Sequence, residues 1–122
     1  MSAKVLVVDD DKLTLEVVRD MLEAGGYKVA TLSAPRLIAN VIVRERPDLI
    51  LVDLRMPELS GDLLVEFIHK FELKVPVVLF SAADEATLKE MAIQSGARGY
   101  ILKSGDRERF LAQVRSFLSP ER

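Results

Sequence analysis

Short apolar runs alternate five times with longer segments of helical periodicity along the 122 residues. The strongest runs are Val5–Val8, Leu49–Val52 and Val75–Phe80, and weaker ones are Lys28–Thr31 and Gly99–Leu102. Strands that are apolar on both sides are typical of parallel sheets covered by helices on both faces. The alternation therefore predicts an α/β fold of five βα units.

Between these runs, apolar residues recur at the i, i+3, i+4 spacing of amphipathic helices. The predicted inward stripes are Thr14, Val17, Val18, Met21 and Leu22; then Leu63, Leu64, Phe67, Ile68 and Phe71; then Leu88, Met91 and Ala92; and finally Phe110, Val114, Phe117 and Leu118, with a further helix over 35–44. Right-handed crossovers leave few topologies for five such units. The predicted fold is flavodoxin-like, a doubly wound (βα)5 with a five-stranded parallel sheet in strand order 2-1-3-4-5.

Composition excludes several classes of function. The chain has no cysteine, which rules out disulfides, thiolate metal sites and cysteine nucleophiles. A formal net charge of -2 gives no electrostatic reason for direct nucleic-acid binding. No apolar run approaches the ~20 residues of a membrane span, and no signal peptide precedes the first strand. We therefore expect a cytoplasmic protein that does not engage a membrane.

Polar side chains follow four of the predicted strands. Asp9 and Asp10 follow the first strand, Asp53 the third, Ser81 the fourth and Lys103 the fifth. Parallel strands bring these ends to one edge, where ligands bind at the switch point. Three crowded carboxylates repel one another unless a cation joins them. An all-oxygen donor set favours a hard divalent ion, Mg²⁺ or alternatively Mn²⁺.

The same residues suit phosphoryl transfer. A carboxylate such as Asp53 can attack phosphorus and form an aspartyl phosphate. A divalent cation on one side and Lys103 on the other would stabilise charge on the equatorial oxygens. The Ser81 hydroxyl would donate to the remaining oxygen.

With these residues the chain resembles the response-regulator receiver family of two-component signalling. The motifs are Asp9-Asp10; Asp53, followed by Met56-Pro57 and Gly61; Ser81-Ala82; and Gly99 to Lys103. The resemblance covers the whole chain and implies one receiver domain over 1–122 with no output domain. It also implies a non-enzymatic switch, phosphorylated by a histidine kinase or phosphotransfer protein. The identity of that kinase, the signal, the downstream target, the oligomeric state, and whether the chain is a piece of a longer protein stay open.

The resemblance assigns a role to each site residue. Asp53 is the phosphoacceptor; Asp9, Asp10, Asp53 and the backbone carbonyl of Arg55 hold the metal; Ser81, Ala82 and Lys103 contact the phosphoryl group; and Ser81 and Tyr100 form the switch pair. Phosphorylation then draws Ser81 inward and lets Tyr100 rotate. The face built by the fourth helix, fifth strand and fifth helix changes shape for a partner.

Two positions depart from the common family pattern. Ser104 follows Lys103 where proline is usual, commonly with a cis peptide bond. Without proline a cis bond costs ~3–4 kcal/mol, so this loop is either strained or takes another path. Arg55 faces an open position at Ala83 across the pocket. Arg55 and Ala83 are therefore expected to modulate the lifetime of the phosphoryl group, with Arg55 shielding it from water or pairing with the acidic cluster before metal binds.

Two other functions compete with the switch. The run ending in Asp9 and Asp11 is similar to the first motif of haloacid-dehalogenase-type phosphatases, but Leu13 stands where threonine or valine is usual and Asp53 is left unexplained. A receiver fold that acts only as an interaction module, without phosphorylation, is the other alternative. Asp11 is interpreted as a helix cap, and His69, the only histidine, as a structural residue.

Overall fold

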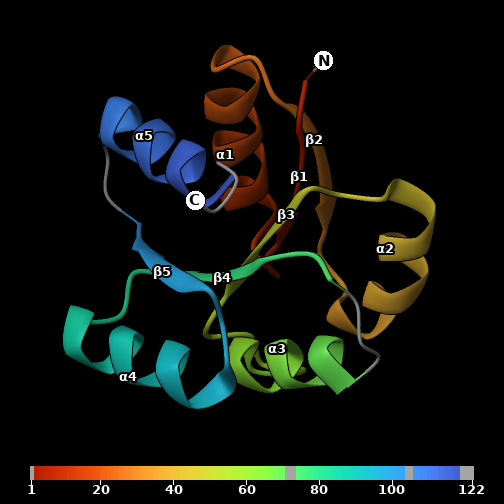
Figure 1. The fold of residues 1–122 in the computed structure, drawn as a ribbon, viewed down its shortest axis with the longest axis vertical. Helices are drawn as coiled ribbons and strands as arrows, with labels where there is room; N and C mark the ends of the chain where they lie inside the picture. Colours follow the sequence, from red (N-terminus) through yellow and green to blue (C-terminus); the bar gives the residue numbers. More distant parts are fainter. Residues whose placement is uncertain (1, 71–73, 104–105, 119–122) are drawn as a thin grey trace.

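In the computed structural model, which describes residues 2–70, 74–103 and 106–118, five strands form one parallel sheet (Figure 1). The strands are β1 (Lys4–Val8), β2 (Lys28–Leu32), β3 (Leu49–Asp53), β4 (Val77–Ser81) and β5 (Gly99–Leu102). Their order is β2-β1-β3-β4-β5, which confirms the predicted topology. Phe71 and Ser104 lie outside the described residues, and the geometry of the Lys103–Ser104 peptide lies there with them.

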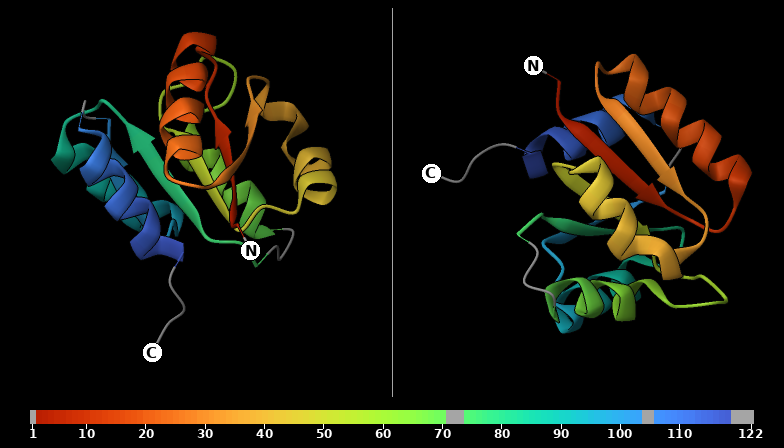
Figure 2. Two further views of the ribbon diagram at one scale, coloured as in Figure 1. Left: turned by 90° about the horizontal axis from the view of Figure 1, so that it is seen from above. Right: turned by 90° about the vertical axis from the view of Figure 1, so that its right-hand side faces the viewer.

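Helices cover both faces of the sheet. They are α1 (Lys12–Ala24), α2 (Ile38–Glu45), α3 (Gly61–Lys70), α4 (Glu85–Ser95) and α5 (Arg107–Leu118), with a single 3₁₀ turn, Pro35–Leu37, before α2. Helices α1 and α5 lie on one face, and α2, α3 and α4 lie on the other (Figures 1 and 2). Because all five strands are parallel, their carboxyl ends lie at the same edge of the sheet. The predicted site residues lie at this edge.

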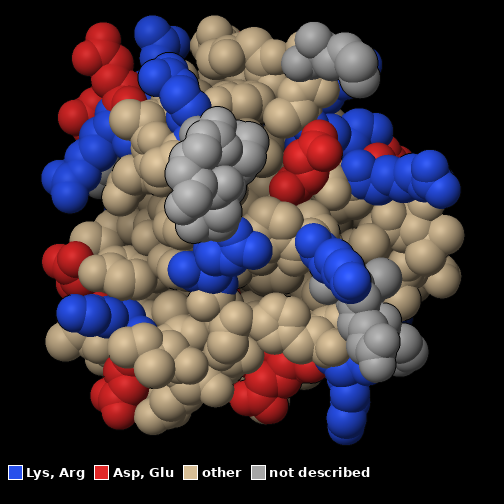
Figure 3. Space-filling model, in the orientation of Figure 1, with Lys and Arg blue, Asp and Glu red and all other residues tan. Residues whose placement is uncertain are grey.

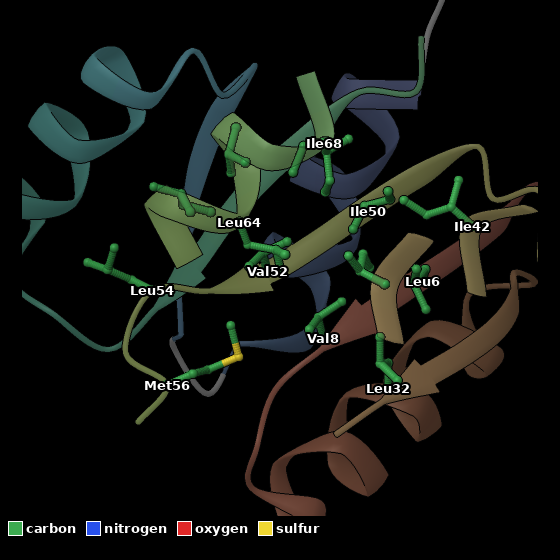
Figure 4. Packing of buried hydrophobic residues seen from close by; sticks show 14 of the residues in the cluster. Leu6, Val8, Leu32, Ile42, Ile50, Val52, Leu54, Met56, Leu64 and Ile68 are labelled. Atoms are coloured by element: carbon green, nitrogen blue, oxygen red, sulfur yellow. The ribbon is translucent and has the colours of Figure 1, made fainter. Parts of the chain in front are cut away.

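The core consists of two apolar clusters, one on each face of the sheet. Strand side chains alternate between the faces, so Leu6 and Ile50 pack toward α2 and α3, while Val5 and Leu49 pack toward α1 and α5. Met56 points from the loop after β3 into the first cluster (Figure 4). This contact ties the loop that follows Asp53 to the core.

Two helices are rotated relative to the predicted stripes. In α1 the buried set includes Leu15, whereas Val17 is 51% exposed. In α3 the buried set includes Val65, whereas Leu63 is 51% and Phe67 39% exposed. Both segments carry apolar residues around more than half of the helix. Periodicity alone therefore does not fix which side faces the sheet, and the prediction for these outward residues was wrong.

The surface carries charge of both signs. On the face shown in Figure 3, cationic and anionic side chains are interspersed over a largely uncharged surface. In the part of the chain that the structure describes, no helix combines the length and apolarity needed to cross a bilayer.

Candidate functional site

Three carboxylates meet at the carboxyl edge of the sheet. Asp9 and Asp10 follow β1 directly, and Asp53 is the last residue of the neighbouring strand β3. One oxygen from each lies within 4.8 Å of the others. Asp9 and Asp53 are buried, at 1% and 6% exposure, and Asp10 is exposed. The structure thus brings together the three carboxylates that strand-end positions indicated.

Lys103 supplies a positive charge to this cluster from the end of β5. Its Nζ donates to Oδ2 of Asp9 at 2.8 Å and to Oδ1 of Asp53 at 3.3 Å. The ammonium also lies 5.4 Å from the centroid of the Phe80 ring, within the range of a cation–π contact. The backbone N–H of Lys103 donates to the carbonyl of Ser81 at 2.9 Å, which fixes where the side chain starts. One cation therefore bridges two buried carboxylates.

The electrostatics of Asp53 follow from this arrangement. Burial raises the pKa of Asp53 above its ordinary value, and the negative charge of Asp9 acts in the same direction. The charge and hydrogen bond of Lys103 oppose both effects, as does a backbone hydrogen bond from Arg55. Because a nucleophilic carboxylate must be ionised, a second cation beside the cluster would favour the reactive form.

The donor set fits a hard divalent cation. All three side chains offer carboxylate oxygens, which Mg²⁺ and Mn²⁺ prefer. Asp9 is already engaged, since its Oδ1 accepts from the backbone N–H of Asp11 at 2.9 Å. Asp10, by contrast, makes no hydrogen bond or ion pair with another described residue, and it faces solvent. The backbone carbonyl of Arg55 stays a predicted ligand.

Ser81 lies at the carboxyl end of β4 and is 1% exposed. Its Oγ accepts from the backbone N–H of Ala83 at 3.2 Å, so the hydroxyl is tied to the segment that leads into α4. Ala82 is exposed and Ala83 is half-buried. A pull on the Ser81 side chain would therefore be passed to the start of α4.

Tyr100 is half-buried in β5, and its ring packs against the cluster shared with α2, α3 and α4. Its Oη donates to Oε2 of Glu85, in the first turn of α4, at 2.8 Å. This hydrogen bond, together with the negative charge of Glu85, raises the pKa of Tyr100. Glu85 was not among the predicted site residues, because the sequence does not indicate which side chain of α4 meets Tyr100.

Gly61 begins α3 against the backbone of the phosphoacceptor candidate. Its N–H donates to the carbonyl of Leu54 at 2.8 Å. A Cβ at this position would lie 2.3 Å from the carbonyl oxygen of Asp53 and 2.9 Å from Cα of Leu54. This close approach requires glycine for steric reasons alone, because the φ angle of Gly61 is not in the left-handed region. Packing of α3 thereby helps to hold the chain around Asp53.

Two residues outside the cluster have structural roles. The Asp11 carboxylate caps α1 by accepting from the backbone N–H of Leu13 at 3.1 Å and from Oγ1 of Thr14 at 2.7 Å, which confirms its interpretation as a cap. His69 is exposed in the last turn of α3, at the end of that helix opposite Gly61. It would contact a Cβ placed on Gly96, so it lies against the end of α4 and away from the carboxylates.

Comparison with known sequences relates this geometry to one family. A model of the response regulator receiver domain matches residues 5–115. The alkaline phosphatase synthesis transcriptional regulatory protein PhoP of Bacillus subtilis is 30% identical over 118 residues, covering 97% of this chain and 49% of PhoP. The polar-differentiation response regulator DivK of Brucella ovis is 29% identical over 120 residues, covering 97% and 98%. The chain thus spans about half the length of PhoP and nearly all of DivK.

Solved structures show the same fold. The chemotaxis protein CheY4 of Vibrio cholerae superposes with a TM-score of 0.87 at 26% identity, covering 97% of this chain and 100% of that chain. The BeF3-activated N-terminal receiver domain of RstA from Klebsiella pneumoniae has a TM-score of 0.87 at 27% identity, covering 96% and 99%. The similarity extends over nearly the whole of each chain.

Proposed function

The chain belongs to the response regulator receiver domain family, and on that premise we propose that it is a phosphoacceptor switch in two-component signalling. Its phosphodonor is a histidine kinase or phosphotransfer protein in the cytoplasm. The observation that supports this most directly is the cluster of Asp9, Asp10 and Asp53, whose oxygens lie within 4.8 Å of one another, with Lys103 bonded to two of them. The chain acts by changing shape and, beyond its own phosphorylation and slow self-hydrolysis, catalyses no turnover.

In the proposed reaction, a carboxylate oxygen of Asp53 attacks the phosphorus of a phosphohistidine. The new P–O bond forms as the P–N bond breaks, and its electron pair stays on the imidazole of the donor. Asp9 and Asp10 would hold the divalent ion, which would neutralise charge on the phosphoryl oxygens. Lys103 would follow one of those oxygens, exchanging its contact with Asp53 for one with the phosphoryl group.

The proposed response begins at Ser81. Its hydroxyl would donate to a phosphoryl oxygen on Asp53 and pull the Ala83 segment, to which it is bonded. Tyr100 would then rotate inward, and the α4–β5–α5 face would change for a downstream protein or an output domain. Moving the population from 1:99 to 99:1 requires about 5.5 kcal/mol of differential stabilisation.

One set of contacts weighs against the phosphatase alternative. Asp11, its required acid/base, is occupied in capping α1. Steady turnover of phosphate esters would nevertheless favour it over a switch, which would show single labelling and slow self-hydrolysis. A pure interaction module would show no Mg²⁺-dependent labelling at all.

Divalent ion is expected both to permit labelling by a small phosphodonor and to stabilise the fold. At 100 times its Kd, Mg²⁺ should raise the free energy of unfolding by about 2.7 kcal/mol, because it relieves repulsion that only the folded chain concentrates. Urea denaturation with Mg²⁺ or with a chelator measures this. The variant Asp10→Ala should lose the stabilisation, while Asp20→Ala, which removes an exposed carboxylate from α1, should keep it. Equal stabilisation of both variants would contradict the proposed metal ligands.

Arg55→Ala is expected to shorten the phosphoryl lifetime several-fold while changing the free energy of unfolding by less than about 0.5 kcal/mol. Arg55 is exposed and follows Asp53 by two residues. The hydrogen bonds of Thr87 are the main cause that lowers the pKa of Asp84, and the charge of Arg55 contributes to the same effect. We propose that the guanidinium keeps water from the acyl phosphate. Loss of label after removal of the donor measures the lifetime. Arg98→Ala, at the opposite edge of the sheet, is the control; matching lifetimes for the two variants would argue against shielding.

A further inference from the structure

One hydrogen bond joins the two parts of the chain that the proposed switch must move apart. It runs from Oη of Tyr100 in β5 to Oε2 of Glu85 in α4 and measures 2.8 Å. The acceptor is a carboxylate, and charge-assisted hydrogen bonds are shorter and stronger than neutral ones. It is the contact that positions the phenol hydroxyl of Tyr100.

Glu85 belongs to the segment that Ser81 would pull. Three residues separate them along the chain, and one of these, Asp84, caps α4 by accepting from the backbone N–H of Thr87 at 3.0 Å and from its Oγ1 at 2.8 Å. The cap makes Glu85 part of a formed first turn. Motion of the segment after β4 would therefore carry the Glu85 carboxylate with it.

Tyr100, in contrast, belongs to the sheet. It pairs in register with Leu79 of β4, and the ladder continues to the bond between the Lys103 N–H and the Ser81 carbonyl. The phenol therefore starts from a fixed backbone, while its acceptor sits on a helix that would shift. Displacement of α4 would stretch or break the hydrogen bond and free the ring to turn.

The surroundings keep the hydroxyl at the surface. Glu85, Tyr100, Leu102, Arg109 and Gln113 line a pocket of about 240 Å³ between α4, β5 and α5. Tyr100 forms part of its wall, and Arg109 and Gln113 approach from α5. As long as Glu85 accepts from Tyr100, the ring is held at this pocket instead of being turned toward Ser81.

We propose that Glu85 is a positioning residue that holds Tyr100 in its outward position and thereby sets how much of the unphosphorylated chain occupies the active form. This inference rests on the proposed function, because it concerns the response that follows phosphorylation of Asp53. Glu85 contacts neither the carboxylate cluster nor the transferred group; it acts through Tyr100. Removing the acceptor raises the active population before any phosphorylation.

The chain offers a direct spectroscopic test, because it contains two tyrosines and no tryptophan. Incorporation of 3-fluorotyrosine gives one ¹⁹F signal from Tyr100 and one from Tyr27, which packs on the α1–α5 side of the sheet and serves as an internal reference. Tyr27→Phe assigns the two signals. Spectra are recorded with and without Mg²⁺ and beryllofluoride, a stand-in for the phosphoryl group.

In Glu85→Ala, the fraction of Tyr100 signal at the beryllofluoride-bound position is expected to rise about fivefold in the untreated protein, as loss of one charge-assisted hydrogen bond at a partly exposed site would produce. Glu85→Gln, which retains an acceptor, should restore most of the outward position. Glu90→Ala is the matched control, because Glu90 lies on the same helix and bonds only Gln94 among described residues. A helix-stability effect would appear in the control as well.

The outcomes separate this inference from the proposed function. A Tyr100 signal that is the same in Glu85→Ala and Glu90→Ala, in a chain whose Asp53 is still labelled, overturns the role of Glu85 and leaves the switch standing. Absence of Mg²⁺-dependent labelling in the unaltered chain removes the proposed function and the inference together. A fivefold rise with rescue by glutamine supports both.

Discussion

Asp53→Asn is expected to abolish labelling by a small phosphodonor completely, because an amide oxygen is a poor nucleophile and the three-carboxylate cluster loses a member. Incorporation of label into the intact protein, followed by mass spectrometry, measures the effect. Label that persists in Asp53→Asn would refute the assignment of the acceptor. The matched control is Asp11→Asn, which should label normally, since asparagine caps a helix as well as aspartate does and Asp11 serves as the cap of α1.

The same substitution is expected to stabilise the fold in the presence of a chelator. Burial raises the pKa of Asp53 in the folded chain above its value in the unfolded chain. The stability that protonated Asp53 contributes to the fold is fully present below the pKa of the unfolded chain, about 3.9. It is lost as pH rises through the higher pKa of the folded chain. At pH 7 the ionised Asp53 therefore costs stability that Asn does not. Urea denaturation from below the unfolded pKa to pH 7 should show that the free energy of unfolding of Asp53→Asn increases relative to that of the wild type as pH rises. A difference that stays constant with pH would contradict the raised pKa of Asp53.

Gly61→Ala is expected to cost about 3 kcal/mol of unfolding free energy, at the upper end of ordinary overpacking, and to reduce labelling sharply. The new Cβ would meet the carbonyl oxygen of Asp53 at 2.3 Å and Cα of Leu54 at 2.9 Å. Both are backbone atoms, so relief requires moving either α3 or the end of β3. Movement of the end of β3 displaces the Asp53 carboxylate from Asp9 and Lys103.

Gly25→Ala is the control for a glycine that is also tightly placed. Its Cβ would meet the two terminal methyl groups of Leu111 at 2.8 and 3.2 Å, and these can rotate away. We expect a cost below about 1 kcal/mol and normal labelling. Urea denaturation gives the free energies, and the initial labelling rate reports the site. Equal losses in both variants would show that the contact of Gly61 with Asp53 has no special importance.

The fold and the carboxylate cluster follow from local sequence patterns. Apolar runs identify the strands, and residues placed immediately after them must meet at one edge of a parallel sheet, which is why Asp9, Asp10 and Asp53 could be grouped. Right-handed crossovers leave few strand orders for five βα units, and the flavodoxin-like order chosen from them is the one observed. These predictions succeed because each depends only on where a residue lies along one strand, and a parallel sheet places residues at the same strand end close together.

Contacts between elements could not be predicted from such patterns. The rotation of α1, which buries Leu15 and exposes Val17, depends on how the helix settles on the sheet. The pairing of Glu85 with Tyr100 depends on the distance between α4 and β5, and the crowding at Gly61 depends on how closely α3 approaches β3. In each case the sequence supplies suitable side chains, but packing selects which of them touch.

The ion pair between Asp9 and Lys103 joins residues 94 positions apart in the chain. During synthesis, all three carboxylates emerge well before the lysine that neutralises them. An incomplete chain would therefore carry a repulsive acidic edge, and contacts of such long sequence separation slow folding. A truncated or partly folded chain thus has the proposed acceptor, Asp53, without the cation that pairs with it in the folded protein.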